Sequence, residues 1–271
     1  MILRTADLLS LALLAALAAA PVVEAQDSSD GAPEGALFLL LPVGAQGVSM
    51  GRSMTWVESP EASFWNPAGL AGITRTQGLV FRGDHPVGDA TAISALFARP
   101  GLGTLGASYF LQDVGEIEQT DVFGNFTGRI TIRNHLGIVS GATRLAERVD
   151  LGLNLKVIRF QFSCRGICTN EGTTATTWAI DAGVQGRPSD RIRVGAMVAH
   201  LGPDLQVLNA EQSDPLPARI RVAGAYNVVA AITDTDDLEG WLSLEIQDRL
   251  RELGSLSYYV GAEFTAGRID A

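Results

Sequence analysis

The fold class follows from RVDLGLNLKVI, residues 148–158, in which polar and apolar residues alternate from Arg148 to Val157. One face carries Val149, Leu151, Leu153, Leu155 and Val157, and the other carries Asp150, Gly152, Asn154 and Lys156. Successive side chains of a β-strand point to opposite faces, so a period of two residues indicates a strand. The segment therefore predicts a strand with one oily face and one wet face.

The same alternation recurs on both sides of this segment, in stretches of about ten residues separated by Gly, Pro, Asp and Asn. We expect about ten strands within residues 76–271, namely Gln77–Gly83, Ala90–Arg99, Thr104–Asp113, Gly128–Thr143, Val149–Phe162, Thr174–Arg187, Arg191–Leu201, Ala218–Ala230, Gly240–Arg249 and Leu256–Ala266. The strands of a soluble sandwich average only about five or six residues, whereas strands of about nine or more cross a bilayer at a tilt. We predict an all-β, antiparallel transmembrane β-barrel, with a soluble periplasmic sandwich as the alternative.

A barrel of this kind turns its polar faces toward an aqueous lumen. The predicted strands place five charged side chains on those faces: Arg191, Arg193, Arg219, Arg221 and Glu245. We expect these charges to set the polarity of the lumen.

The first 75 residues have a different character. Arg4 precedes an apolar run from Leu8 to Val23 that ends in small residues, which predicts a secretory signal peptide over residues 1–25 and export to the outer membrane. Residues 26–35 are small, polar and acidic, as expected of a flexible leader. Residues 36–75 mix short apolar runs with Gly and Pro and keep no single period, so they predict an irregular plug segment packed inside something larger.

Several classes of function fit the chain poorly. A net charge of −10 without a clustered basic stretch argues against a nucleic-acid partner. The only cysteines, Cys164 and Cys168, are expected to form a disulfide in an oxidising compartment, because the rival zinc site would need further ligands nearby. The G-x-S-x-G match at residues 47–51 lies in an irregular stretch away from the histidines, so we expect no enzyme, metal or cofactor.

The stretch Phe-Trp-Asn-Pro-Ala-Gly-Leu-Ala at residues 64–71 stands out within the predicted plug. An Asn before Pro favours a turn, and the aromatic residues beside it supply apolar anchors. One interpretation is a packed turn that docks the plug. The other is a binding or gating site formed by Trp65, Asn66, Pro67, Ala68 and Gly69.

This stretch resembles the N-terminal signature of the PorV/PorQ family of FadL-like outer-membrane barrels, in which G-A-x-x-x-G-M-G precedes W-N-P-A-G-L. Residues 44–51 and 58–70 carry the two parts, with Ser49 where the family prefers glycine and residues 59–61 replacing its acidic run. Further matches occur at residues 178–184, 194–196, 200–203 and 214–221, with His200 in place of an asparagine.

The resemblance implies a FadL-like barrel, typically of fourteen strands, with an N-terminal plug that contains the Asn66-Pro67-Ala68 turn. We expect a plugged channel for hydrophobic or small solutes in outer-membrane lipid. The alternative is a type IX secretion scaffold that binds secreted cargo proteins, with the cysteine loop as a stiffened contact element. Because only about ten strands are counted and the chain lacks a terminal aromatic residue, we expect the barrel to be C-terminally incomplete.

Overall fold

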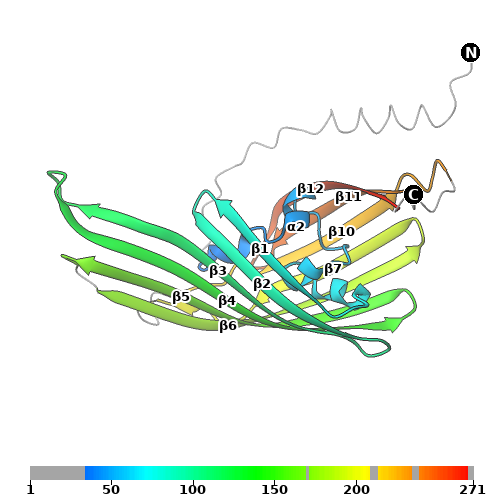
Figure 1. Cartoon of the computed structure of the whole chain (residues 1–271), viewed down its shortest axis with the longest axis horizontal. Helices are drawn as coiled ribbons and strands as arrows, with labels where there is room; N and C mark the ends of the chain where they lie inside the picture. The colour runs from blue at the N-terminus through cyan, green and yellow to red at the C-terminus, as the bar shows by residue number, and fades with distance from the viewer. Residues whose placement is uncertain (1–33, 169–170, 208–212, 234–237, 268–271) are drawn as a thin grey trace, which may run out of the picture. The chain divides into compact units, whose positions relative to one another are not determined.

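The computed structural model describes residues 34–168, 171–207, 213–233 and 238–267, and these form one antiparallel sheet around an N-terminal segment (Figure 1). The sheet has ten strands: β1 Gln77–His85, β2 Gly88–Arg99, β3 Gly103–Thr120, β4 Phe126–Ala146, β5 Val149–Gly166, β6 Gly172–Ser189, β7 Ile192–Leu201, β10 Arg219–Asn227, β11 Leu238–Arg249 and β12 Glu252–Ala266. The predicted fold class is confirmed. The predicted signal peptide and most of the predicted leader lie outside the described residues.

Strands β3 to β6 are longer than predicted, with 18, 21, 18 and 18 residues. The predicted strands stopped at Asp113 and Phe162 because the apolar alternation ends there. The backbone ladder nevertheless continues, and Glu116 still pairs with Thr131. Most of the extra residues lie at the end of the sheet that carries connections 121–125 and 167–171, which we call the loop end. The opposite end, with connections 100–102 and 147–148, is the turn end. Backbone hydrogen bonds hold a strand together even where no apolar face marks it.

The sheet turns its apolar residues outward and its polar residues inward. On β5, Leu153, Leu155 and Val157 are 59%, 53% and 54% exposed, whereas Asn154 and Lys156 between them are each 1% exposed. A soluble sandwich buries the apolar face instead. This polarity matches a sheet whose outer surface faces lipid and whose inner surface encloses polar groups.

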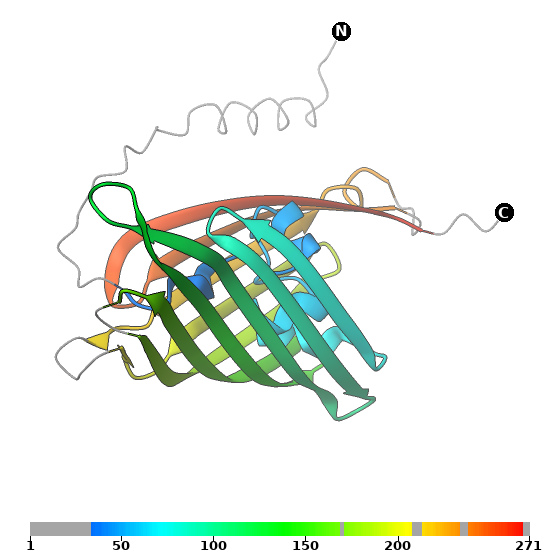
Figure 2. The ribbon, with the colours of Figure 1, turned by 60° about the vertical axis from the view of Figure 1, so that its left-hand side comes forward.

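Strands β1 and β12 are the two edges of the sheet, and within the described residues no ladder joins them. The sheet curves around the N-terminal segment, drawn in blue in Figure 2. The edge strand β12 contacts that segment, because the Gln46 amide donates a hydrogen bond to Glu263 (2.7 Å). The expected C-terminal incompleteness of the barrel stays a prediction.

Residues 36–75, which we call the plug, form four short helices: η1 Leu37–Leu40, α2 Ala45–Ser49, η2 Pro60–Ser63 and η3 Pro67–Gly72. Both η2 and η3 begin with proline, and the side chains of Ser59 and Asn66 cap them. Proline suits the first turn of a helix because its missing N–H would have no partner there. Among the described residues, no helix combines the length and the apolar character that crossing a membrane requires.

The connection between β7 and β10 folds over the inner side of the sheet at the loop end. It contains the short strands β8 (Leu205–Gln206) and β9 (Ser213–Asp214), which pair with each other and were not predicted. Its residues Leu205 and Leu216 are buried in the same apolar cluster as Phe38 of η1. This connection therefore helps to hold the plug in place.

Candidate functional site

The Asn66 turn is the point where the plug is fixed to the sheet. Asn66 is fully buried, and its side-chain Oδ1 accepts a hydrogen bond from the Ala68 amide at the start of η3 (3.1 Å). Its Nδ2 donates to the carbonyls of Thr55 (2.7 Å) and Val184 (3.3 Å). One side chain thus caps a helix, braces the plug and reaches β6.

Three glycines on the inner face of the sheet make room for this turn. Gly152 and Gly183 lie directly opposite each other on β5 and β6. A Cβ atom on Gly152 would overlap the backbone of Pro67 and Ala68, and one on Gly183 would overlap the Asn66 side chain. A Cβ on Gly195 of β7 would overlap the Thr55 carbonyl. We call Gly152, Gly183 and Gly195 the glycine seat.

Asn66→Ala is expected to destabilise the fold by roughly 1–3 kcal/mol, because it removes a helix cap and leaves buried partners unsatisfied. The measurement is the free energy of unfolding in detergent, from a urea titration. Asn66→Ser is the matched variant, because it keeps a side-chain acceptor near the Ala68 amide but loses the bonds to Thr55 and Val184. Equal stability of Asn66→Ala and wild type would show that the turn does not anchor the plug.

The predicted lumen charges contact the plug rather than open water. The Glu245 carboxylate accepts a hydrogen bond from the Thr55 amide (2.9 Å) and lies 4.0 Å from Arg221. Arg221 stacks over the Trp65 ring (5.4 Å), and Arg193 stacks over Trp241 (4.4 Å). These inward charges therefore hold the two tryptophans and the plug backbone in position.

Of the remaining two predicted lumen charges, Arg219 faces the inner side of the sheet and Arg191 does not. Arg219, at the start of β10, forms two hydrogen bonds with Glu34, each 2.6 Å long. Arg191 lies in the turn before β7 with its side chain exposed. The structure thus brings four of the five predicted charges to the inner side, and Arg191 lies apart from them.

The Arg219–Glu34 contact predicts an acid-sensitive attachment just before the plug. The hydrogen bond from Arg219 lowers the pKa of the Glu34 carboxyl below its ordinary value of 4.5. The pair therefore stabilises the fold fully above pH 4.5, and that stabilisation is lost as the pH falls through the lowered pKa. Wild type should exceed Glu34→Gln in unfolding midpoint at neutral pH and match it in strong acid. A difference that is constant with pH would contradict the prediction.

A buried charged network on β5, β6 and β7 was not predicted as a site. Lys156 Nζ lies 2.6 Å from Asp181 Oδ2 and 3.2 Å from His200 Nδ1. The other Asp181 oxygen accepts the His200 amide (2.8 Å), and Asn154 Nδ2 donates to Asp181 (2.9 Å) and to the Ser63 carbonyl of the plug (3.0 Å). The alternation did place Asn154 and Lys156 on the polar face. A single sequence does not show, however, which residues of β5, β6 and β7 contact one another.

A second charged group closes the turn end. Asp150 is 1% exposed, accepts a hydrogen bond from Arg144 (2.8 Å) and forms an ion pair with Arg187 (3.0 Å). Glu58 of the plug also forms an ion pair with Arg187. The plug is therefore tied to the sheet by charge at the turn end as well as by the Asn66 turn.

Above the Lys156 network, toward the loop end, the plug and the sheet enclose an apolar chamber. Its walls are Phe38, Leu39, Leu41, Val43 and Phe64 of the plug and Phe110, Leu136 and Ile138 of the sheet, with Lys156 and His200 at its polar end. The cavity left inside is about 20 Å³, room for about one water molecule. In this conformation η1 itself fills the chamber.

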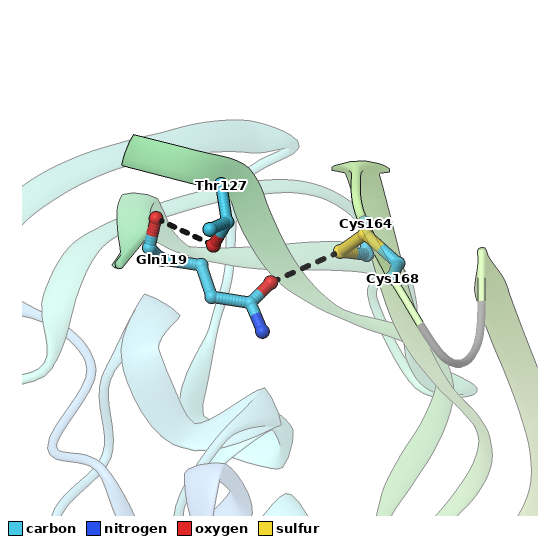
Figure 3. The surroundings of a disulfide bond; sticks show 4 residues. All are labelled: Gln119, Thr127, Cys164 and Cys168. Carbon is cyan, nitrogen blue, oxygen red and sulfur yellow. Dashed lines mark hydrogen bonds between the residues drawn. A yellow bond between two sulfur atoms is a disulfide. The ribbon is translucent and has the colours of Figure 1, made fainter. Parts of the chain in front are cut away.

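The two cysteines lie at the loop end of β5, joined as a disulfide (Figure 3). Beside them the Gln119 side chain of β3 approaches Cys164 (Oε1 to Sγ, 3.8 Å), and the Gln119 carbonyl accepts a hydrogen bond from Thr127 (3.0 Å). The cross-link therefore lies beside the extended part of β3 and β4, far along the strands from the Asn66 turn.

The chain was compared with known proteins. A scan against protein-family models finds no match, and neither does a search of curated proteins. Among solved structures it is similar to the CymD monoaromatic hydrocarbon channel, with 13% identity and a TM-score of 0.51 over 84% of this chain and 76% of that one. Two further structures are the Pseudomonas putida toluene transporter TodX (12% identity, TM-score 0.49, 82% and 76% covered) and a Pseudomonas aeruginosa FadL homologue (13%, 0.47, 77% and 69%). The chain thus has a FadL-like fold, as predicted.

Proposed function

We propose that this protein is a plugged outer-membrane channel for hydrophobic small molecules, of the PorV/PorQ type. The observation that carries the proposal is the apolar chamber enclosed between the plug and a sheet whose outer face is apolar. The narrower assignment is supported by the stretches that resemble the family's signatures, which are residues 44–51, 58–70, 178–184, 194–196, 200–203 and 214–221. The proposal accounts for an enclosed apolar space that lies directly beside the buried Lys156–Asp181–His200 network.

The outer face supports a place in a membrane. Side chains such as Leu155 on β5, Trp178 on β6 and Val222 on β10 are about half exposed and belong to an apolar belt that crosses the strands of the sheet. In water such a belt would be a large exposed apolar patch, which soluble monomers rarely carry. The signal peptide predicted at residues 1–25 would deliver the chain to the outer membrane.

The chamber suggests the class of solute. Phe38, Phe64 and Phe110 line it, and its Lys156 is already neutralised by Asp181 (2.6 Å). A carboxylate would find no free cation among the residues that line the chamber, so we propose an uncharged hydrocarbon, aromatic or aliphatic, as the solute. The fold is shared with CymD, which is a monoaromatic hydrocarbon channel.

Passage requires η1 to move, because the chamber has no room for a solute while Phe38 and Leu39 fill it. Phe38→Ala should leave a larger cavity and speed the entry of toluene. The full chain would be produced in the outer membrane of a Gram-negative host, and toluene uptake by whole cells would be measured. Phe97→Ala is the matched control, because Phe97 lies on the outer face and is 56% exposed. Equal uptake in cells carrying the empty vector and in all three proteins would overturn the channel.

A second candidate is a surface scaffold for secreted proteins. Strands β3 to β6 run 18 to 21 residues, well beyond the roughly ten residues needed to cross a bilayer. The tip between β3 and β4 exposes Val122 and Phe123, which are 93% and 85% accessible. Cargo that co-purifies with wild type but not with a Val122→Ser, Phe123→Ser double variant would favour this function.

A further inference from the structure

The outer face of β4 and β5 carries positive charge directly above the apolar belt. On β5 the apolar residues end at Val157, and Arg159 and Arg165 follow on the same outward face. Within the described residues neither arginine has an ion-pair partner. Arg159 lies directly opposite His135 on β4, and Arg165 lies directly opposite Arg129. Among the described residues no carboxylate balances the charge of Arg159, so this charge is available to an anion bound on the outer face.

A hollow beneath Arg159 gives such an anion a place with an apolar floor. It has a volume of about 370 Å³ and is lined by Tyr109, His135, Gly137, Val157, Arg159 and Gln161. A Cβ atom on Gly137 would meet nothing within 4 Å, so this glycine leaves a dent in the outer surface. The Tyr109 hydroxyl is bound to His135 Nδ1 (2.6 Å), which fixes the wall of the hollow. The polar groups lie on the loop-end side and the apolar ones toward the belt.

We propose that this hollow binds an anionic lipid, one whose headgroup phosphate has no cationic group beside it to balance its charge. The phosphate would lie against Arg159 with His135 and Gln161 as further donors, and an acyl chain would lie over Gly137 and Val157. Arginine binds phosphate through its planar fork of N–H donors. Tyr109 and Trp178, which is 49% exposed beside Val157, occupy the interfacial depth where aromatic side chains gather in membrane barrels. The proposal rests on the membrane location proposed above.

Two other arginines near this rim already have partners, and Arg165, which has no ion-pair partner among the described residues, does not line the hollow. Arg129 pairs with Glu116 (3.0 Å) and Arg133 pairs with Asp113 (2.9 Å). Arg159 is therefore the cation whose charge is available above the hollow, and the proposal predicts that it dominates lipid affinity.

The test is native mass spectrometry of the full protein, purified from the outer membrane in dodecyl maltoside, with added diphosphoryl lipid A or phosphatidylcholine. We expect one tightly held lipid A, and affinity lower by on the order of tenfold for Arg159→Gln, the loss of one charge-assisted contact. Gly137→Leu fills the hollow without changing charge and should weaken binding similarly. Arg99→Gln is the matched control, since Arg99 is an exposed arginine at the turn end of β2.

Several outcomes would overturn the proposal. Unchanged affinity in Arg159→Gln and Gly137→Leu would show that the hollow is not the site, and an equal loss in Arg99→Gln would show that any rim arginine suffices. If phosphatidylcholine bound as tightly as lipid A, the apolar belt alone would explain lipid binding. Competition by inorganic phosphate would indicate a site for a free anion instead of a lipid. Toluene uptake by the same variants separates the two proposals: normal uptake without lipid A binding overturns only this one. A protein that is monodisperse without detergent overturns the membrane location itself.

Discussion

Replacing Gly183 with valine is expected to drive the Asn66 turn out of the glycine seat and to loosen the plug. The new side chain would overlap Asn66, and the space over the glycine opposite it, Gly152, is already filled by Pro67 and Ala68. Overpacking of a well-packed site costs about 1–3 kcal/mol. The backbone hydrogen bonds between strands keep the sheet in place, so we expect the plug to move away and relieve the overlap. The plug should therefore spend more time away from its docked position.

The measurement is the accessibility of Ser53, which is fully buried and whose hydroxyl has no hydrogen-bond partner among the described residues. Ser53→Cys changes this side chain little and allows labelling by a small thiol reagent. Labelling should be roughly tenfold faster with Gly183→Val, since about 1.4 kcal/mol corresponds to tenfold in an equilibrium constant. Gly224→Val is the matched control, because a Cβ there meets nothing within 4 Å. Equal labelling rates in both backgrounds would show that the seat does not hold the plug.

The sequence predicted the sheet well because lipid and lumen impose opposite polarity on alternate residues. In β3 beyond Asp113 this contrast disappears. The strand continues to Thr120, but the alternation of apolar and polar residues stops, so the predicted end of this strand at Asp113 was wrong. The Asn66 turn could be singled out from its local residues. Its seat could not, because Gly152 and Gly183 become neighbours only through the β5–β6 register.

The lumen charges illustrate the same limit. Their inward direction followed from alternation for Arg193, Arg219, Arg221 and Glu245, but their partners did not. Arg221 meets Trp65 and Arg219 meets Glu34 across a long stretch of intervening chain. A single sequence shows which face a residue occupies, whereas the path of the plug decides which groups it meets.

Removing either partner of the Lys156–Asp181 pair is expected to destabilise the protein by about 3–5 kcal/mol, the usual cost of leaving an uncompensated buried charge. The two side chains are 2% and 0% exposed. Lys156→Met leaves the Asp181 carboxylate without its partner, and Asp181→Asn leaves the Lys156 ammonium without its partner. The free energy of unfolding of each variant would be compared with that of wild type by urea titration in detergent. The equivalent change at an exposed pair, Arg82→Gln beside Asp89, should have little effect, because its side chains are 71% and 52% exposed.

The double variant Lys156→Met, Asp181→Asn decides whether the loss comes from charge or from packing. With both charges gone, the introduced asparagine side chain would still offer an oxygen to the His200 amide, and the introduced methionine would fill most of the lysine's volume. The double variant should then be less destabilised than the sum of the single variants by about 2 kcal/mol or more, as coupled buried neighbours are. Additive losses would mean that the two side chains act separately. Coupling would show that the two charges stabilise the fold as a pair. Asp181 would then balance the charge of Lys156 beside the apolar chamber, so that the chamber presents no free cation to a solute.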